Sequence, residues 1–350
     1  MNRMENALYA QDIASAAKQD LPWEELREKT IVISGATGLI GCCLIDTLAY
    51  RSLRDHLNCT IYALTRDPER AASRATPLWA SCVRFVQCDI NRQRPEIPEH
   101  ADYVIHAASN THPVAYATDP IGTILTNILG TQNMLELAAD HGAERSLFLS
   151  SVEIYGENRG DCERYDETYC GYIDCNTLRA GYPESKRAGE ALCQAYIRQK
   201  RLDIVIPRLC RIYGPTMLPS DTKALSQFLK NGLAGQDIVL KSEGRQHFSY
   251  CYVADAVSAL LFCLFRGENG QAYNVADPAS DITLRELAEL IATNAGTRVV
   301  FDLPDSIESA GYSKATKALL DSSKLHALGW RAAHSIQEGI ERTMQILAAL

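Results

Sequence analysis

A tyrosine and a lysine four residues apart, Tyr182 and Lys186, form the pattern best suited to chemistry in this sequence. On a helix, positions four apart share one face, so both side chains point the same way. Pro183 fits the first helical turn, which has no use for its missing N–H. A phenol titrates near pH ~10, and a neighbouring ammonium with a cationic nicotinamide ring would lower that pKa. Tyr182 is therefore a candidate general base that removes a hydroxyl proton while a hydride leaves the same carbon.

A hydroxyl partner for this base follows the predicted strand 147–149, at Ser151. Ligands of open parallel sheets lie outside the carboxyl ends of the strands, where Tyr182 must also work. Ser151 could hold the substrate oxygen there, although a serine that merely caps a turn is the alternative. Glu153, two residues further on, could move a proton at a carbon beside a ketone, or it could be a capping residue.

A glycine-rich turn lies between a short apolar run, residues 30–34, and an apolar helix predicted over 44–53. The order strand, glycine turn, helix places backbone N–H groups around a pyrophosphate. The spacing is G-x-x-G-x-x-G, and the sequence predicts dinucleotide binding here. The residues expected to contact the cofactor in this turn are Gly35, Thr37, Gly38, Leu39, Ile40 and Gly41.

The strand predicted over 60–65 ends in Arg66, where an NAD site would carry a carboxylate for the ribose. Arg66 could pair with a 2′-phosphate, which favours NADP over NAD. Alternatively, Arg66 is solvated beside Asp67. Further residues at strand ends and on the adjoining helices are expected to contact the cofactor. They are Asp89, Ile90, Ala107, Ala108, Ser109, Asn127, Tyr182, Lys186 and Pro207.

Charge and composition limit the partners of this 350-residue chain. The net charge of −8, with scattered basic residues, argues against nucleic acid and anionic membrane. No apolar run is long enough to span a bilayer. Twelve cysteines lack a zinc-binding spacing, so we expect thiols in a reducing cytoplasm and no metal. Three of them, Cys162, Cys170 and Cys175, crowd one loop, where a metal or redox role is the less favoured alternative.

Strands alternate with helices up to about residue 208, which predicts an α/β fold with a buried parallel sheet. The alternation of strands and helices ends after residue 220, and no second glycine-rich turn follows. The chain after residue 220 is therefore expected to cover the substrate and not the cofactor. Residues 1–28 should form a short helical extension at the domain edge. Strands are expected at 83–88, 103–106, 202–208 and 272–276; helices at 120–141, 182–200, 220–232, 255–265, 283–294 and 336–350; and a loop or edge at 244–252.

Together these motifs resemble the extended short-chain dehydrogenase/reductase family of nucleotide-sugar epimerases, dehydratases and decarboxylases. The resemblance covers about 29–345 and also rests on Thr126–Thr131, Tyr155-Gly156, Tyr213–Pro215 and Tyr252–Asp255. It implies a doubly wound Rossmann domain over 29–208 plus about 245–278, interleaved with a smaller α/β substrate-binding domain over 209–244 and 279–350. It also implies homodimers built from helices 120–141 and 182–200. In such enzymes the sugar C4 hydroxyl is first oxidised, and the 4-keto sugar is then modified.

Two residues are similar to those of the UDP-glucuronate decarboxylase branch: Glu153, shared with the 4,6-dehydratases, and Arg179, three before Tyr182. Arg179 could hold a carboxylate or diphosphate, or pair with Glu184 on the surface. Residues 109–116 also resemble the decarboxylases. The positions expected to bind the nucleotide sugar are Asn110, Thr111, Arg179, Arg208, Arg211, Arg245, His247 and Tyr252.

The chain departs from its resemblance at three positions. Val152 replaces the Asp of the dehydratases, which argues against 4,6-dehydration, and the Ser of the decarboxylases. Phe248 stands where decarboxylases carry an Arg, so His247 or Arg245 would have to substitute. Arg211 stands where the family often has Asn. We therefore expect a decarboxylase-like or epimerase-like course. The alternatives are an NADP-dependent reductase of a keto-sugar or small carbonyl, and, less favoured, a non-catalytic dinucleotide sensor.

Overall fold

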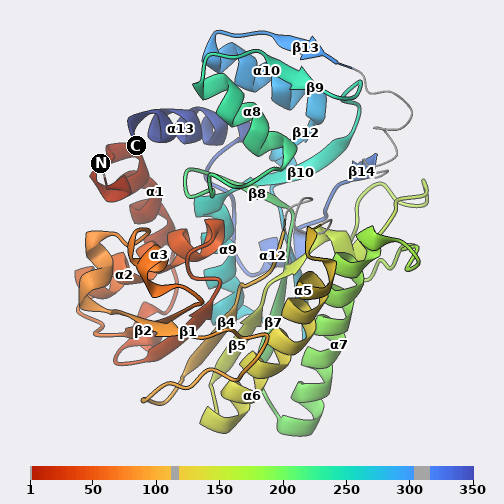
Figure 1. The fold of residues 1–350 in the computed structure, drawn as a ribbon. Helices are drawn as coiled ribbons and strands as arrows, with labels where there is room; N and C mark the ends of the chain where they lie inside the picture. Colours follow the sequence, from red (N-terminus) through yellow and green to blue (C-terminus); the bar gives the residue numbers. More distant parts are fainter. Residues whose placement is uncertain (1, 112–117, 303–315) are drawn as a thin grey trace.

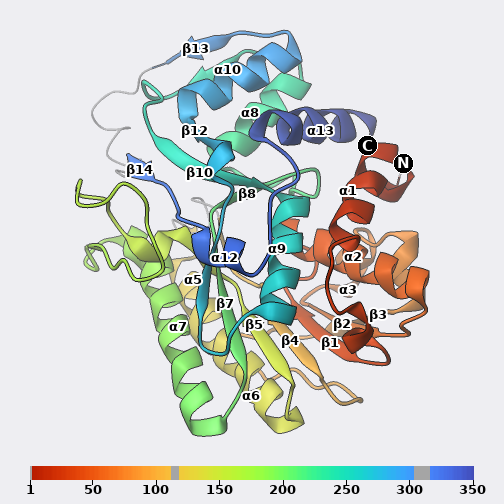
Figure 2. The ribbon, with the colours of Figure 1, turned by 180° about the vertical axis from the view of Figure 1, so that it is seen from behind.

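A parallel β-sheet forms the centre of the larger domain in the computed structural model, which describes residues 2–111, 118–302 and 316–350. Helices cover both faces of this sheet (Figures 1 and 2). The short strand β6 (Ser150–Ser151) continues beside β7. In spatial order the other strands are β11 (Ala272–Val275), β7 (Ile204–Leu209), β5 (Arg145–Phe148), β4 (Tyr103–His106), β1 (Thr30–Ser34), β2 (Thr60–Thr65) and β3 (Val83–Gln87). This arrangement confirms the predicted Rossmann-like fold.

Two sets of helices sandwich the sheet. On one face lie α2 (Leu39–Asp55) and α9 (Val253–Arg266), and on the other α5 (Pro120–Leu125), α6 (Thr131–His141) and α7 (Gly181–Lys200) (Figures 1 and 2). Both faces are covered, and strands β1 and β4 are accordingly buried along their whole lengths. α2 begins five residues earlier than predicted, so that its first turn is part of the glycine-rich turn.

The helix predicted over 120–141 is interrupted by a π-helical turn at Thr126–Gly130, between α5 and α6. A π turn inserts one residue into the helical ladder and is frequent at functional sites. Here it carries Asn127, whose side chain is fully buried against α7. The interruption therefore positions a polar residue that an uninterrupted helix would place differently.

The smaller domain sits above the carboxyl ends of the main sheet strands in Figure 1. The prediction of a loop or edge at 244–252 is wrong, because β10 is the central strand of a second sheet and pairs with three others. Of the stretch 245–278, β10 therefore joins the second sheet, whereas α9 and β11 belong to the first domain. The remaining elements are β8 (Arg211–Tyr213), α8 (Ala224–Leu233), β9 (Ile238–Leu240), β10 (His247–Tyr252), β12 (Asp281–Thr283), α10 (Leu284–Ala295), β13 (Val299–Phe301), β14 (Lys317–Ala318), α12 (Ser323–Ala327) and α13 (Ile336–Ala349), with α3 (Pro68–Ala72) in the larger domain.

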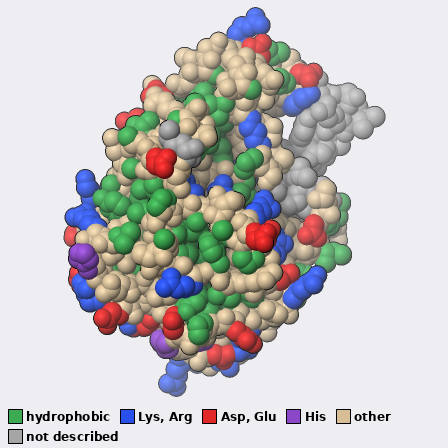
Figure 3. Space-filling view, turned by 60° about the vertical axis from the view of Figure 1, so that its left-hand side comes forward, with side chains coloured by type: hydrophobic (Ala, Val, Ile, Leu, Met, Phe, Trp, Pro, Cys, Tyr) green, Lys and Arg blue, Asp and Glu red, His purple; other side chains and the backbone are tan. Residues whose placement is uncertain are grey.

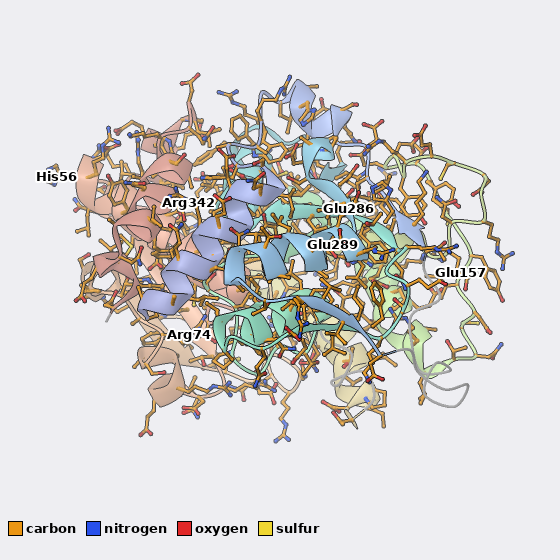
Figure 4. All side chains as sticks on the ribbon, turned by 90° about the horizontal axis from the view of Figure 1, so that it is seen from above. His56, Arg74, Glu157, Glu286, Glu289 and Arg342 are labelled. Carbon is orange, nitrogen blue, oxygen red and sulfur yellow. The ribbon has the colours of Figure 1, made fainter. Side chains whose placement is uncertain are left out.

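The N-terminal helix α1 (Ala7–Ala17) joins the two domains, and both chain ends lie near each other (Figure 1). Asp12 is 1% exposed and accepts hydrogen bonds from the Tyr252 hydroxyl at 2.6 Å and from Arg342 Nε at 2.7 Å. Figure 4, seen from above, shows Arg342 on α13. A buried carboxylate with two donors from distant segments ties the extension to the smaller domain.

Candidate active site

The glycine-rich turn has the geometry of a pyrophosphate cradle. Gly35 has φ +71°, and a Cβ there would lie 2.6 Å from the Ala107 carbonyl carbon. A Cβ on Gly41 would lie 2.2 Å from the Gly35 oxygen, so both positions require glycine. Gly38 caps α2 without a side-chain hydrogen bond, which leaves the amides of the first turn free for an anion. These features fit the pyrophosphate of a dinucleotide.

A second hollow lies beyond the carboxyl ends of β2 and β3. Arg66, Asp89 and Arg92 are among the residues that line it. Arg66 is exposed, whereas the Asp67 carboxylate caps α3 by accepting from the Arg70 N–H at 3.0 Å. Asp67 is therefore engaged in helix capping, and Arg66 faces the hollow where an adenosine ribose would lie. Ile90 is buried close by, next to the π turn.

Helix α7 begins at Gly181, so Tyr182 and Pro183 occupy its first turn as predicted. Tyr182 and Lys186 are both buried. Lys186 Nζ donates to the Leu149 carbonyl at 2.7 Å and lies 4.8 Å from the centre of the Phe148 ring. Burial lowers the pKa of Lys186 from 10.5 to about 8. The ammonium thus lies at the carboxyl end of β5, and its loss of water there destabilises its charged form.

The pKa of Tyr182 differs from the prediction. Burial raises it to about 12, and the charge of Glu153 adds to this, while hydrogen bonding with Ser151 and Ser109 lowers it. The expected lowering by Lys186 is absent, because that ammonium is directed to the Leu149 carbonyl. In the protein alone the phenol is therefore protonated at neutral pH, and a lower pKa would require a further positive charge above the ring.

A chain of hydrogen bonds orients Ser109 beside Tyr182. The Ser109 hydroxyl donates to Asn127 Oδ1 at 2.8 Å, and Asn127 Nδ2 donates to the Ser185 hydroxyl at 3.0 Å. Ser185 in turn donates to the Tyr182 carbonyl at 2.9 Å. Sequence analysis expected Ser109 and Asn127 only as cofactor contacts. Their link to Tyr182 depends on the π turn, which no local sequence pattern indicates.

Ser151 combines the two roles considered for it. Its hydroxyl accepts from the Glu153 N–H at 3.2 Å, which caps the 3-10 helix Val152–Tyr155, and it also hydrogen-bonds with Tyr182. The Glu153 carboxylate lies between two guanidinium groups, with Arg179 Nη2 and Arg211 Nη2 each 3.9 Å from one of its oxygens. The alternative Arg179–Glu184 surface pair is not formed in the structure.

Three arginines predicted to bind substrate differ in their surroundings. Arg208 forms a two-pronged ion pair with Glu190, at 2.7 and 3.0 Å, and is only 11% exposed. Arg245 projects into solvent and pairs with Glu243. Of these three, Arg211 lies at the Glu153 carboxylate, as Arg179 does. Arg208 has its contact with α7, a segment that the sequence does not relate to it, whereas Arg245 pairs with a residue two positions before it.

Other predicted contacts are also displaced from the cluster. The Tyr252 hydroxyl is bound to Asp12, and His247 lies in β10 opposite Thr283. Pro207 is enclosed within the strand β7. The Tyr252 hydroxyl and the Pro207 ring thus have partners inside the protein, whereas the His247 side chain is half-buried.

The loop after β4 meets the start of α8. Asn110 Nδ2 donates to Thr123 Oγ1 at 3.3 Å, and Lys223 Nζ lies 3.5 Å from Thr111 Oγ1. Lys223 is not among the site residues predicted from the sequence, although a lysine immediately before a helix of the substrate-covering part of the chain is a signal that could have found it. Of the segment 109–116, residues 112–116 lie outside the described residues.

Basic side chains gather near the junction of the two domains. The face seen in Figure 3 is hollowed between the smaller and larger domains, and several Lys and Arg side chains lie in and around the hollow. This distribution suits an anionic ligand. Within the described part of the chain, no group of three or more metal-ligating side chains occurs, and all twelve cysteines are free thiols. No helix among the described residues is both long and apolar enough to cross a bilayer.

The chain matches the model of the NAD dependent epimerase/dehydratase family over residues 31–276. Curated relatives include UDP-glucuronic acid decarboxylase 5 of Arabidopsis thaliana, 31% identical over 314 residues that cover 89% of this chain and 86% of the relative. UDP-glucuronic acid decarboxylase 1 of Danio rerio is 29% identical and covers 92% of this chain and 73% of the relative.

Solved structures share the fold. A dTDP-glucose 4,6-dehydratase from Streptomyces venezuelae with NAD bound matches with a TM-score of 0.73 and 25% identity, covering 91% of this chain and 96% of the other. UDP-glucose 4-epimerase of Thermotoga maritima matches with a TM-score of 0.75 and 21% identity, covering 91% and 98%. Both solved structures therefore share the fold of this chain over nine-tenths of its length.

Proposed function

The chain belongs to the NAD-dependent epimerase/dehydratase family, whose members are enzymes of nucleotide-sugar modification, and from this premise we propose a reaction through a 4-keto sugar. The observation that carries the proposal is the group of Ser151, Tyr182 and Glu153 at one strand end, with Lys186 beneath it. A bound nicotinamide dinucleotide supplies hydride transfer. The residues of the chain supply a proton acceptor, a hydroxyl to orient the substrate and a carboxylate for a second proton.

Tyr182 is the proton acceptor in this proposal. Ser151 and Ser109 both hydrogen-bond to its hydroxyl, so the phenolic oxygen is held in place beside these two side chains. A sugar carbinol that gives its hydroxyl proton to Tyr182 and its carbon-bound hydride to the oxidised dinucleotide would become a ketone, which acidifies or weakens bonds at the neighbouring carbon. Glu153 is placed to exchange a proton there, because its backbone N–H is bound to Ser151 itself.

The course after the ketone is proposed to be decarboxylase-like or epimerase-like. Val152 lies between Ser151 and Glu153 and is buried, so this position offers no carboxyl group for elimination of water. The relatives named as UDP-glucuronic acid decarboxylases are consistent with the first course. An NADP-dependent reductase is the second candidate, favoured by Arg66 in the hollow beyond β2.

Product analysis tests these courses. The enzyme is incubated with NAD or NADP and a panel of UDP- and TDP-sugars, while the reduced nicotinamide absorbance and product masses are followed. A new sugar without net reduced cofactor supports the 4-keto route, with loss of carbon dioxide marking decarboxylation. Net reduced cofactor would support a dehydrogenase or reductase. In the matched control, Tyr182→Phe should abolish turnover while cofactor still binds; unchanged turnover would remove Tyr182 from the mechanism.

We also propose that the protein forms a homodimer through α5, the π turn and α7. Four apolar side chains on or next to these helices are exposed: Ile121 (71%), Leu125 (38%), Leu129 (37%) and Leu178 (75%). A neighbouring apolar hollow is lined by Ile124, Ile128 and Gly181. A contiguous apolar face of this kind is typical of an interface. Light scattering should give twice the chain mass, and Ile121→Glu should reduce it to that of a monomer.

The free thiols and the absence of a described membrane-spanning helix agree with a cytoplasmic location, which we likewise propose. Fractionation of cells that produce the protein tests it. Recovery in the membrane or secreted fraction would contradict this location.

A further inference from the structure

Arg211 lacks the close protein contacts that a structural arginine makes. Arg208, three residues earlier, makes two direct bonds to Glu190 and further bonds to the Tyr155 hydroxyl and the Glu167 carbonyl. For Arg211 the contact with Glu153 is 3.9 Å, beyond hydrogen-bond distance. Its Nη1 is buried and has no hydrogen-bond partner among the described residues. A guanidinium stays charged at any physiological pH, so a buried donor of this kind requires an acceptor.

The guanidinium is nevertheless held in place. Arg211 Cζ lies 3.5 Å from the centre of the Phe248 ring, which is 7% exposed. The register of the two strands explains this stack, because Arg211 of β8 is paired with Tyr250 of β10 and Phe248 lies two residues before it on the same face. A planar cation on an aromatic face is pre-organised to present its N–H groups in one direction.

The Arg211 guanidinium lies close to the residues proposed to act on the sugar ring of the substrate. Glu153 follows Ser151 by two residues, and Ser151 hydrogen-bonds with Tyr182, so Arg211 lies at the reacting end of the pocket. Arg179, Glu153 and Arg211 together carry a formal charge of +1, which favours an anion. Lys223 and Thr111 meet at a different place, where α8 begins, and are candidates for the diphosphate.

We propose that Arg211 is a specificity-determining residue that holds a carboxylate on the sugar ring of the substrate. This inference rests on the proposed nucleotide-sugar function and narrows it to acidic sugars. Phe248 stands in β10 at the position where the decarboxylases carry an arginine, so this strand lacks that cation. Arg211 supplies a cation from the adjacent strand β8. Arg179, on the other side of Glu153, completes the anion site.

Binding to a catalytically inactive protein tests this proposal separately from turnover. Affinities of Tyr182→Phe protein, loaded with NAD, are measured by calorimetry for UDP-glucuronate and UDP-glucose, which differ at C6. We expect the acid to bind at least 10-fold more tightly. Adding Arg211→Asn should weaken binding of the acid by about 10- to 100-fold, the range of charge-assisted hydrogen bonds, and change the neutral sugar less than threefold.

Three further variants keep the test decisive. Arg211→Lys retains the charge and should recover part of the affinity for the acid. Arg211→Asn combined with Phe248→Arg returns a guanidinium from β10 and should also recover part of it. Arg298→Gln, which removes an arginine 83% exposed on the smaller domain, should change neither sugar.

The outcomes separate the two proposals. If wild-type protein binds the acid no more tightly than the neutral sugar, or if Arg211→Asn weakens both equally, the carboxylate role is overturned. If acid preference and its loss are found but no sugar is converted by the protein with Tyr182 intact, the proposed reaction fails and the binding role stands.

Discussion

We predict that Lys186 is required for activity but reduces the free energy of unfolding of the protein. The ammonium is 2% exposed, and burial lowers its pKa from 10.5 to about 8. At about 1.4 kcal/mol per pH unit, the protonated side chain costs the folded state about 3 kcal/mol at pH 7. Lys186→Met removes this cost. It also removes the bond to the Leu149 carbonyl and the contact with Phe148, each worth about 1 kcal/mol.

The sign follows from proton binding. Between pH 8 and pH 10.5 the unfolded chain holds the Lys186 proton and the folded chain does not, so wild-type stability rises with pH across this window. Below pH 8 both states are protonated and the cost is complete. The stability of Lys186→Met relative to wild type should therefore fall by about 2 to 3 kcal/mol between pH 7 and pH 10, whatever the lost contacts contribute.

Urea unfolding of cofactor-free protein at pH 7 and pH 10 measures this difference. We expect Lys186→Met to be about 1 kcal/mol more stable than wild type at pH 7, less stable at pH 10, and inactive at both. Lys200→Met makes the same change at an exposed position of the same helix and should show no dependence on pH. A stability difference for Lys186→Met that is constant from pH 7 to pH 10 would refute the argument that desolvation governs this lysine.

Three further predictions concern other parts of the molecule. Glu153→Gln should stop the reaction after the first oxidation, so mass spectrometry should detect a 4-keto sugar; normal product would leave Glu153 a structural role. Asp12→Ala should lower the free energy of unfolding by about 3 kcal/mol in urea, because the buried donors of Tyr252 and Arg342 lose their acceptor. A loss below about 1 kcal/mol would show that Asp12 does not hold the N-terminal helix to the smaller domain. Arg66→Gln should raise the dissociation constant of NADPH at least 10-fold more than that of NADH in fluorescence titrations; equal changes would place Arg66 outside the ribose site.

Much of the fold was predictable because local sequence patterns determine it. The central strand β1 is a short apolar run, and glycine is required at position 41 by the Gly35 oxygen only six residues away, although Gly35 itself is also required by Ala107 from a distant strand end. The central place of β10 was not predictable in this way. The aromatic residues Phe248, Tyr250 and Tyr252 alternate with Ser249 and Cys251, as is typical of a strand, but the strand is central only because β8, β12 and β14 arrive from distant parts of the chain.

By itself the sequence determined that Tyr182 and Lys186 share one helix face beside a dinucleotide loop, because helical spacing and turn geometry are local. Tertiary structure decided what these residues experience. Burial raises the pKa of Tyr182 and lowers that of Lys186, since neither group can keep its water shell at the packed strand ends. It also decided that Arg208 is neutralised by Glu190 while Arg211, three residues away, is left with a donor to offer. The charge and spacing of these side chains can be taken from the sequence, but their partners and their loss of water depend on which distant segments pack against them.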